Sequence, residues 1–377
     1  MIKYKLRVIR GGIMDTKEMI WGSDIKTLKE ELESIKKNNP KIKLFYDWRN
    51  NPELELYLLK LLINSYKSTD EKAFREKMPS YIHYIEHFLV KGIEKKLFTA
   101  TNIKRLVKRL NENFKTLKFI PIELSDCYGR SYDDVIEINS NLKEHENSPS
   151  LTKEELVVLY MFHEIGHKIL QIRNQKVTED YCMTFKKVIN EKKQKYAGML
   201  PYGHIDCGLL MIEESLSQEL AEIMTYKVFD KIRPELRLES EFGITFLTNH
   251  DFYGVFEKPT VDLGRTLRGC STKGATSKEI LYRMIKKALD TDNFALDLIS
   301  EYNEDDATLY MDLCFILQNM GNILNEKYAS FGQRQLPKSE RTIEQSLKNI
   351  DGLAKRNHDF REIPKEGLVR IDFEKYK

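Results

Sequence analysis

The sequence has few of the features that would assign a class at once, beginning with cysteine. It contains five cysteines in 377 residues, an odd number, widely scattered and without a CxxC pair. A disulfide framework or a cysteine-based zinc site is therefore not expected, and a reducing compartment is the default environment. These cysteines are Cys127, Cys182, Cys207, Cys270 and Cys314.

Long apolar runs are also missing. The longest, at 56–63 and 156–162, are too short to cross a bilayer. The first ten residues, MIKYKLRVIR, alternate like a strand and lack the apolar centre of a secretory signal. We therefore expect a cytoplasmic protein with no membrane partner, and the sequence leaves signal-independent secretion open.

The chain has no strong charge of either sign. Lysine and arginine total 61 against 58 acidic residues, which gives a net charge of +3. This balance argues against a nucleic-acid partner. A local basic run around 104–109 has the spacing of an ordinary solvated helix face. The apolar content of 41% and the charged content of 32% are those of a typical globular protein.

Histidine is rare, at 8 of 377 residues, yet two histidines stand in the five-residue string HEIGH at 163–167. Residues four apart on a helix share one face, so His163 and His167 can both direct an imidazole nitrogen at one metal ion. Glu164 is placed to accept a proton from a metal-bound water. This is the HExxH motif of zinc peptidases, and about 0.02 chance matches are expected in a chain of this composition.

The sequence around this motif predicts a buried helix. Thr152 and Glu155 have the spacing of a capping box, and the almost wholly apolar run 156–162 follows. Gly166 costs about 1 kcal/mol of helix propensity against alanine, but it would let backbone or substrate approach closely. Upstream, the alternation in 132–139 predicts a strand. The order of strand, loop and HExxH helix resembles zincin metallopeptidases, which implies an edge strand beside a groove for an extended peptide.

Two histidines and a water leave zinc short of one protein ligand. A second helix is predicted at about 209–230, and its acidic start, EESLSQELAE, resembles the ligand helix of the glutamate zincins (gluzincins). The resemblance implies that Glu214 is the third ligand and that Gln218 is its supporting polar partner. Ser215 and Gln218 depart from the glycine and the acidic residue common there. The choice of ligand therefore stays open to two further carboxylates, Glu213 and Glu219.

A reversed motif, HYIEH at 83–87, competes with HExxH. Over about ten residues it resembles the zinc motif of the insulinase/pitrilysin peptidases. Those enzymes have a glycine-rich strand region before the motif, whereas 51–78 here is charged and helical. We therefore predict an amphipathic helix, with a zinc site around His83 and His87 as the rival hypothesis. The residues expected to face the core are Ile82, Ile85, Phe88 and Leu89.

Zinc peptidases usually need a tyrosine or histidine donor to stabilise the oxyanion of the tetrahedral intermediate. Tyr202 and His204, in a predicted loop at 200–208 before the glutamate helix, are the nearest candidates. His250 and Tyr253 offer a second pair. Asp206 is a candidate for orienting a ligand histidine.

One further string nearly matches the phosphate-binding pattern GxxxxGK[ST]. It is GCSTKGAT at 269–276, with Ala275 where the lysine is needed and no apolar strand before it. Thr276 and Glu279 instead predict a capping box and a helix start.

Together these patterns predict a helix-dominated α+β fold. A zincin-like catalytic core at 117–232, with a small sheet, an edge strand, the HExxH helix and the glutamate helix, would lie between flanking regions. These are a mostly helical α+β region at 1–116 and a helical region at 233–377. The function predicted is a zinc (Zn2+) metalloendopeptidase acting on a peptide or protein substrate; the alternative is an inactive zincin-like scaffold that binds a protein partner. The sequence does not define cleavage specificity or oligomeric state.

The remaining predicted elements can be stated by range. Strands are predicted at 3–9, 43–46, 117–124, 135–139 and 368–373. Further helices are predicted at 25–37, 53–66, 80–95, 102–114, 179–196, 277–290, 307–327 and 339–354.

Overall fold

The structure is a computed structural model in which helices dominate, as the sequence predicted. It divides into two compact units, 1–142 and 143–377. The division into three regions at 116 and 232 stays a prediction. The residues that the structure describes are 16–67, 72–94, 97–113, 118–122, 129–132, 135–139, 153–174, 176–180, 183, 202–229, 250–303, 307–330 and 342–362.

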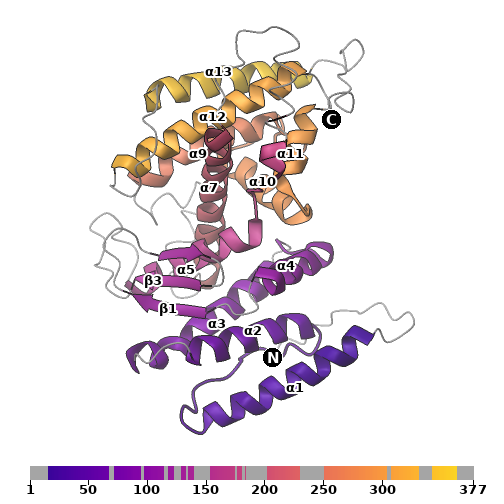
Figure 1. Ribbon diagram of the computed structural model, residues 1–377, viewed down its shortest axis with the longest axis vertical. Helices are drawn as coiled ribbons and strands as arrows, with labels where there is room; N and C mark the ends of the chain where they lie inside the picture. The colour runs from indigo at the N-terminus through magenta and orange to yellow at the C-terminus, as the bar shows by residue number, and fades with distance from the viewer. Residues whose placement is uncertain are drawn as a thin grey trace. The chain divides into compact units, whose positions relative to one another are not determined.

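The first unit is built around one apolar helix. Its helices are α1 (Thr16–Lys36), α2 (Pro52–Lys67), α3 (Lys72–Glu94) and α4 (Ala100–Asn113). The sequence of α2, LELYLLKLLI, is apolar on nearly every side, which is the pattern of a helix buried all round. Accordingly α2 contacts α1, α3, α4 and the first strand. The core of this unit therefore lies along α2 (Figure 1).

A three-stranded sheet completes the first unit. Its strands are β1 (Lys118–Ile122), β2 (Gly129–Tyr132) and β3 (Val135–Asn139), in the order β1-β3-β2. β1 runs parallel to β3, with Lys118 opposite Val135, and β2 pairs antiparallel to β3. The strands predicted at 117–124 and 135–139 are confirmed, but the expectation of an edge strand before the HExxH helix is wrong, because β3 pairs on both sides and is the middle strand. β2 was not predicted because GRSY carries no apolar alternation.

The strand predicted at 43–46 is wrong. This segment belongs to the loop between α1 and α2, and the buried Glu86 of α3 binds its backbone. The backbone N–H groups of Phe45 and Tyr46 donate to the Glu86 carboxylate at 3.0 and 3.4 Å, and Trp48 Nε1 donates to it at 2.8 Å. One side chain thus satisfies the donors that a partner strand would otherwise satisfy.

The second unit is assembled around helix α7. Its helices are α5 (Lys153–Leu170), α7 (Tyr202–Phe229), α9 (His250–Thr266), α10 (Ser277–Asp290), α11 (Phe294–Asn303), α12 (Ala307–Ser330) and α13 (Ile343–Glu362). Figure 1 shows α7 among these helices, and it contacts α5, α9, α10 and α12. Leu209, Ile212, Leu216 and Leu220 on α7 are fully buried. The core of this unit therefore surrounds α7.

Two glycines allow α7 to approach its neighbours closely. A Cβ added at Gly166 of α5 would lie 3.1 Å from Ser217 Cα, and one added at Gly208 of α7 would lie 2.0 Å from the Leu317 carbonyl oxygen on α12. The prediction that Gly166 permits close approach is therefore confirmed, and the partner is the α7 backbone.

The helix boundaries follow the local signals. The helix predicted at 277–290 is α10 to the residue, and the capping box between Thr276 and Glu279 that begins it is present. The predicted loop at 200–208 is wrong, because α7 already begins at Tyr202. Two helices were not predicted: α9, which has Pro259 inside it, and the short α11.

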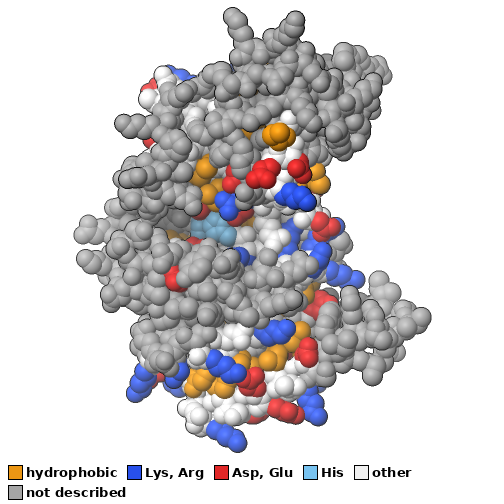
Figure 2. Space-filling view, in the orientation of Figure 1, with side chains coloured by type: hydrophobic (Ala, Val, Ile, Leu, Met, Phe, Trp, Pro, Cys, Tyr) orange, Lys and Arg blue, Asp and Glu red, His pale blue; other side chains and the backbone are white. Residues whose placement is uncertain are grey.

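Several predicted elements cannot be compared with the structure. The strands at 3–9 and 368–373 lie outside the described residues, as does most of the helix at 179–196. Within the described part of the chain, no helix is both long and apolar enough to cross a membrane. Figure 2 shows basic and acidic side chains interspersed among the described residues of the face in view.

Candidate metal centre

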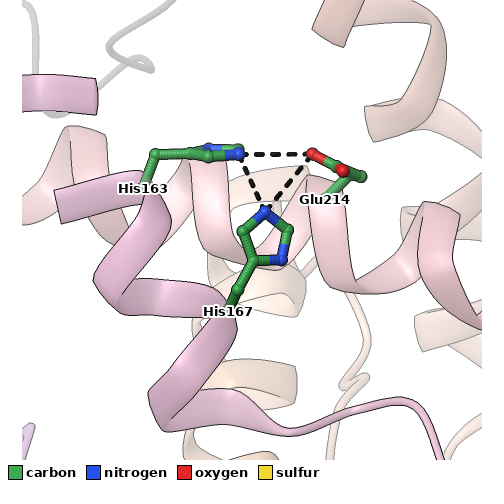
Figure 3. Close-up of side chains that lie close together, drawn as sticks. All are labelled: His163, His167 and Glu214. Carbon is green, nitrogen blue, oxygen red and sulfur yellow. Dashed lines mark hydrogen bonds and ion pairs between the residues drawn. The ribbon is translucent and has the colours of Figure 1, made fainter. Parts of the chain in front are cut away.

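Two turns of α5 and one turn of α7 bring three side chains to a single point. His163 and His167 extend from neighbouring turns of α5, and Glu214 extends toward them from α7 (Figure 3). The two Nε2 atoms are 3.0 Å apart, and Glu214 Oε2 lies 3.2 Å from His163 Nε2 and 3.5 Å from His167 Nε2. Among the described residues, this is the group of histidine, cysteine and acidic side chains that could hold a metal ion.

The spacing of these three atoms fits a tetrahedral zinc ion. With zinc–nitrogen and zinc–oxygen bonds of about 2.0–2.1 Å, neighbouring ligand atoms in a tetrahedral site lie about 3.3–3.4 Å apart. The three distances here, 3.0, 3.2 and 3.5 Å, bracket that value. The three side chains are therefore spaced as one face of a tetrahedron around such an ion would be.

The outer nitrogens of both rings fix how the rings are protonated. His163 Nδ1 lies 3.0 Å from Gln218 Oε1, and His167 Nδ1 lies 3.1 Å from Glu213 Oε1. Both oxygens are acceptors, so we assign the Nδ1 proton to each ring, which leaves a lone pair on each Nε2. Two lone pairs and a carboxylate oxygen thus converge, and only a cation or a proton can satisfy all three.

The pKa values of His167 and Glu214 are shifted in the directions that favour a positive charge between these atoms. Burial alone would lower the pKa of His167, but the carboxylates of Glu214 and Glu213 outweigh it and raise that pKa well above 6.5. Burial would likewise raise the pKa of Glu214, but His167 and His163 hold it well below 4.5. In the metal-free chain a proton therefore occupies the place among these atoms that a divalent cation would take.

The partners of the two histidines are themselves held. Gln218 Nε2 donates to Glu222 Oε1 at 2.9 Å, which is one turn further along α7. Glu213 Oε2 accepts the backbone N–H of Arg173 at 3.0 Å. Arg173 follows shortly after the end of α5, where Gln171 has a φ of 47°. Each imidazole is therefore oriented by a side chain that has a second contact of its own.

Glu164, next to the first histidine, has the environment of a base. Its side chain is buried, and burial, with a smaller contribution from Glu214, raises its pKa, although His163 and His167 act in the opposite direction. A carboxylate with a raised pKa binds a proton more readily than one in water. Glu164 is therefore suited to accept a proton beside this group.

The three candidate carboxylates of α7 have separate positions. Glu214 lies with the histidines, and Glu213 binds the far side of the His167 ring. Glu219 instead faces α10, where its Oε2 lies 2.5 Å from Lys278 Nζ. Glu214 is thus the carboxylate placed to complete the group.

The predicted oxyanion donors lie on helices instead of loops. Tyr202 and His204 fall in the first turn of α7, and His250 and Tyr253 fall in the first turn of α9. Their side chains lie outside the described part of the structure, so their roles stay predictions.

Asp206 does not have the contact expected of it. Its carboxylate lies 3.5 Å from the guanidinium of Arg173, and the outer nitrogens of both ligand histidines are bound by Gln218 and Glu213. Asp206 therefore contacts the segment after α5 instead of an imidazole.

The rival site around HYIEH has no third ligand among the described residues. Glu86 binds the 45–48 backbone and indole, and His87 Nε2 lies 2.9 Å from the Tyr46 hydroxyl. The ring of His83 packs against Phe45, with centroids 4.2 Å apart. The predicted amphipathic helix is confirmed, because its core residues are at most 2% exposed: Ile82, Ile85, Phe88 and Leu89.

One participant was missed from the sequence. Glu214, Gln218 and Glu222 are spaced four apart, so the helix places all three on one side of α7. This spacing is the signal that the sequence offers for Glu222, but it does not show which of the three side chains faces a histidine.

Comparison of the chain with models of protein families, with curated proteins and with solved structures found no match. The residues and geometry of the site are therefore what indicate a function for this chain.

Proposed function

We propose that this protein is a zinc-dependent metalloendopeptidase. The observation that carries the proposal is the convergence of two imidazole lone pairs and one carboxylate oxygen at tetrahedral spacing, beside the glutamate of an HExxH helix. We further propose a peptide or protein as substrate, and neither nucleic acid nor membrane as partner.

His163, His167 and Glu214 would hold the zinc ion. When bound, zinc polarises a carbonyl oxygen and lowers the pKa of a water molecule to about 7. The Nδ1 contacts of the two imidazoles keep both Nε2 atoms available as ligands. The chain thus presents two neutral nitrogens and one anionic oxygen, a set that zinc prefers and that leaves a net positive charge for substrate activation.

Glu164 is the proposed proton carrier. Its carboxylate would accept a proton from the attacking water and deliver it to the amine that leaves when the peptide bond breaks. Burial raises the pKa of Glu164, which favours the first step, and it keeps bulk water from competing for the proton before the second. Tyr202 and His204 are proposed as donors to the oxyanion.

Metal analysis and one isosteric substitution test the proposal. We expect purified protein to carry one zinc ion per chain and to cleave denatured protein or a quenched fluorescent peptide mixture. Glu164→Gln should keep the zinc and lose about 10²–10⁴-fold in cleavage rate, because only the proton carrier is removed. Glu155→Gln, a change of another buried carboxylate on α5, serves as the matched control and should keep activity.

Each failure has a separate meaning. Protein that binds no zinc would favour the inactive scaffold and reject the enzyme. A fully zinc-loaded Glu164→Gln variant that cleaves at the wild-type rate would show that the proposed proton transfer is wrong. His163→Ala should remove the metal; retention of zinc in that variant would place the site elsewhere in the chain.

A further inference from the structure

The two ligand histidines are oriented by different chemical groups. His167 Nδ1 faces a carboxylate, that of Glu213, whereas His163 Nδ1 faces the side-chain amide of Gln218. A carboxylate offers only acceptors, so it selects one imidazole tautomer unaided. An amide offers an oxygen at one end and an NH2 group at the other, so by itself it selects neither tautomer.

A second contact removes this ambiguity at Gln218. Its NH2 group donates to Glu222 Oε1 at 2.9 Å, and a carboxylate cannot return a donor to it. Rotation of the amide by half a turn would set oxygen against oxygen at Glu222 and would direct NH2 at His163 Nδ1. Gln218 is 4% exposed and Glu222 is 5% exposed, so water can do little to replace the hydrogen bond between their side chains.

The carboxylate of Glu222 interacts with a cation of the same unit. This cation is Lys278, at the start of α10. Its ammonium interacts with the carboxylates of Glu222, Glu219 and Glu257. Together these carboxylates raise the pKa of Lys278 although burial would lower it, so it stays cationic. The position of Lys278 follows from the capping box at Thr276, which fixes where α10 begins.

We propose that Glu222 is a positioning residue for the metal centre and acts through Gln218. By holding the amide in one orientation, it keeps the proton on His163 Nδ1 and the lone pair on Nε2. In this chain the group that faces His163 is an amide, and the carboxylate that orients it lies one turn further along α7. The inference rests on the proposed function in one respect, that the site binds zinc.

The test compares zinc affinities, measured by competition with a chelator, for full-length variants loaded with zinc alone. Glu222→Gln should weaken zinc binding by about 10-fold or more, in the range seen when partners of ligand histidines are removed, because two facing amides can pair in either orientation. Adding Gln218→Glu to that variant should restore zinc affinity to within about threefold of wild type. In the exchanged pair the carboxylate at position 218 accepts from His163 Nδ1, and the amide at position 222 donates to that carboxylate.

Glu219→Gln is the matched control. Glu219 is on the same helix and is similarly buried at 6%, but it contacts Lys278 and not Gln218. Its zinc affinity should stay near the wild-type value, and an equal loss in this variant would refute a specific role for Glu222.

Three other outcomes would overturn the proposal. An unchanged affinity in Glu222→Gln would refute it, and so would a loss that the exchanged pair does not restore while circular dichroism shows both variants folded. If Glu222→Gln does not fold, the folded exchanged pair still decides: wild-type affinity supports the relay and weak affinity refutes it. Wild-type protein without zinc affinity would instead reject the proposed function itself.

Discussion

The most direct test of the close packing between α5 and α7 is a single methyl group at Gly166. This glycine lies between the two ligand histidines, and Ser217 opposite it lies between Glu214 and Gln218. An alanine Cβ would stand 3.1 Å from both Cα and Cβ of Ser217 and 3.3 Å from its carbonyl oxygen. Ordinary contact begins at 3.4 Å, so the helices must separate by a few tenths of an ångström.

Two effects of Gly166→Ala oppose each other in stability. Alanine gains about 1 kcal/mol of helix propensity over glycine, and overpacking costs about 1–3 kcal/mol. We therefore expect a net change between about zero and 2 kcal/mol of destabilisation in the metal-free protein. Gly352→Ala on α13 is the matched control, because nothing lies within 4 Å of its added Cβ, and it should stabilise by about 1 kcal/mol.

Zinc affinity should respond more than stability does. A metal site must be held within about 0.5 Å of its working geometry, and separating α5 from α7 by a few tenths of an ångström uses most of that margin, because Glu214 moves away from both imidazoles. We expect Gly166→Ala to weaken zinc binding by about 10-fold and Gly352→Ala to leave it unchanged, both measured by chelator competition and chemical unfolding. If Gly166→Ala stabilises the protein as much as Gly352→Ala and binds zinc as tightly as wild type, the close approach does not hold the site together.

Two other predictions follow from the charges and the packing around the site. Zinc must displace a proton wherever His167 is protonated, so zinc affinity, measured across a pH series, should rise by up to about tenfold per unit between about pH 6 and 7; a flat profile would contradict the raised pKa. In the metal-free chain, the raised pKa of His167 stabilises the fold fully below pH 6.5, and the lowered pKa of Glu214 stabilises it fully above pH 4.5. Their pairing should therefore contribute most to the free energy of unfolding between pH 4.5 and 6.5. Gly208→Ala would force α7 and α12 apart by more than about 1 Å and should destabilise by about 3 kcal/mol or more in denaturant unfolding, and wild-type stability would contradict the contact with the Leu317 carbonyl.

The part of the site that the sequence predicted is the part carried by helical spacing. His163, Glu164 and His167 follow from the geometry of one helix, and Glu214 followed from a resemblance to a second ligand helix. In the structure the two histidines and Glu214 lie together. Spacing alone could not choose among the carboxylates of α7, because that choice depends on how the helix is turned against α5 and α10.

The parts that the sequence did not predict depend on partners distant along the chain. The 43–46 segment alternates like a strand, but Glu86, 40 residues away, satisfies its backbone instead. The start of α7 at Tyr202 was missed because Pro201 and Gly203 are typical of turns, whereas Gly203 lies within the helix. Glu222 was missed for a related reason, since its role follows only when Gln218 is known to face His163.

The burial of α7 along most of its length has a consequence for how this protein can vary. One side of the helix carries Glu214 and its polar neighbours, while Gly208 on the same helix is wedged against α12. Because α7 is one continuous helix, a displacement at Gly208 would also displace the turn that carries Glu214. A larger side chain on α12 would therefore change the position of Glu214 relative to the two imidazoles. Substitutions that enlarge side chains of α12 near Leu317 should therefore weaken metal binding, although the three residues that could hold the ion lie on α5 and α7.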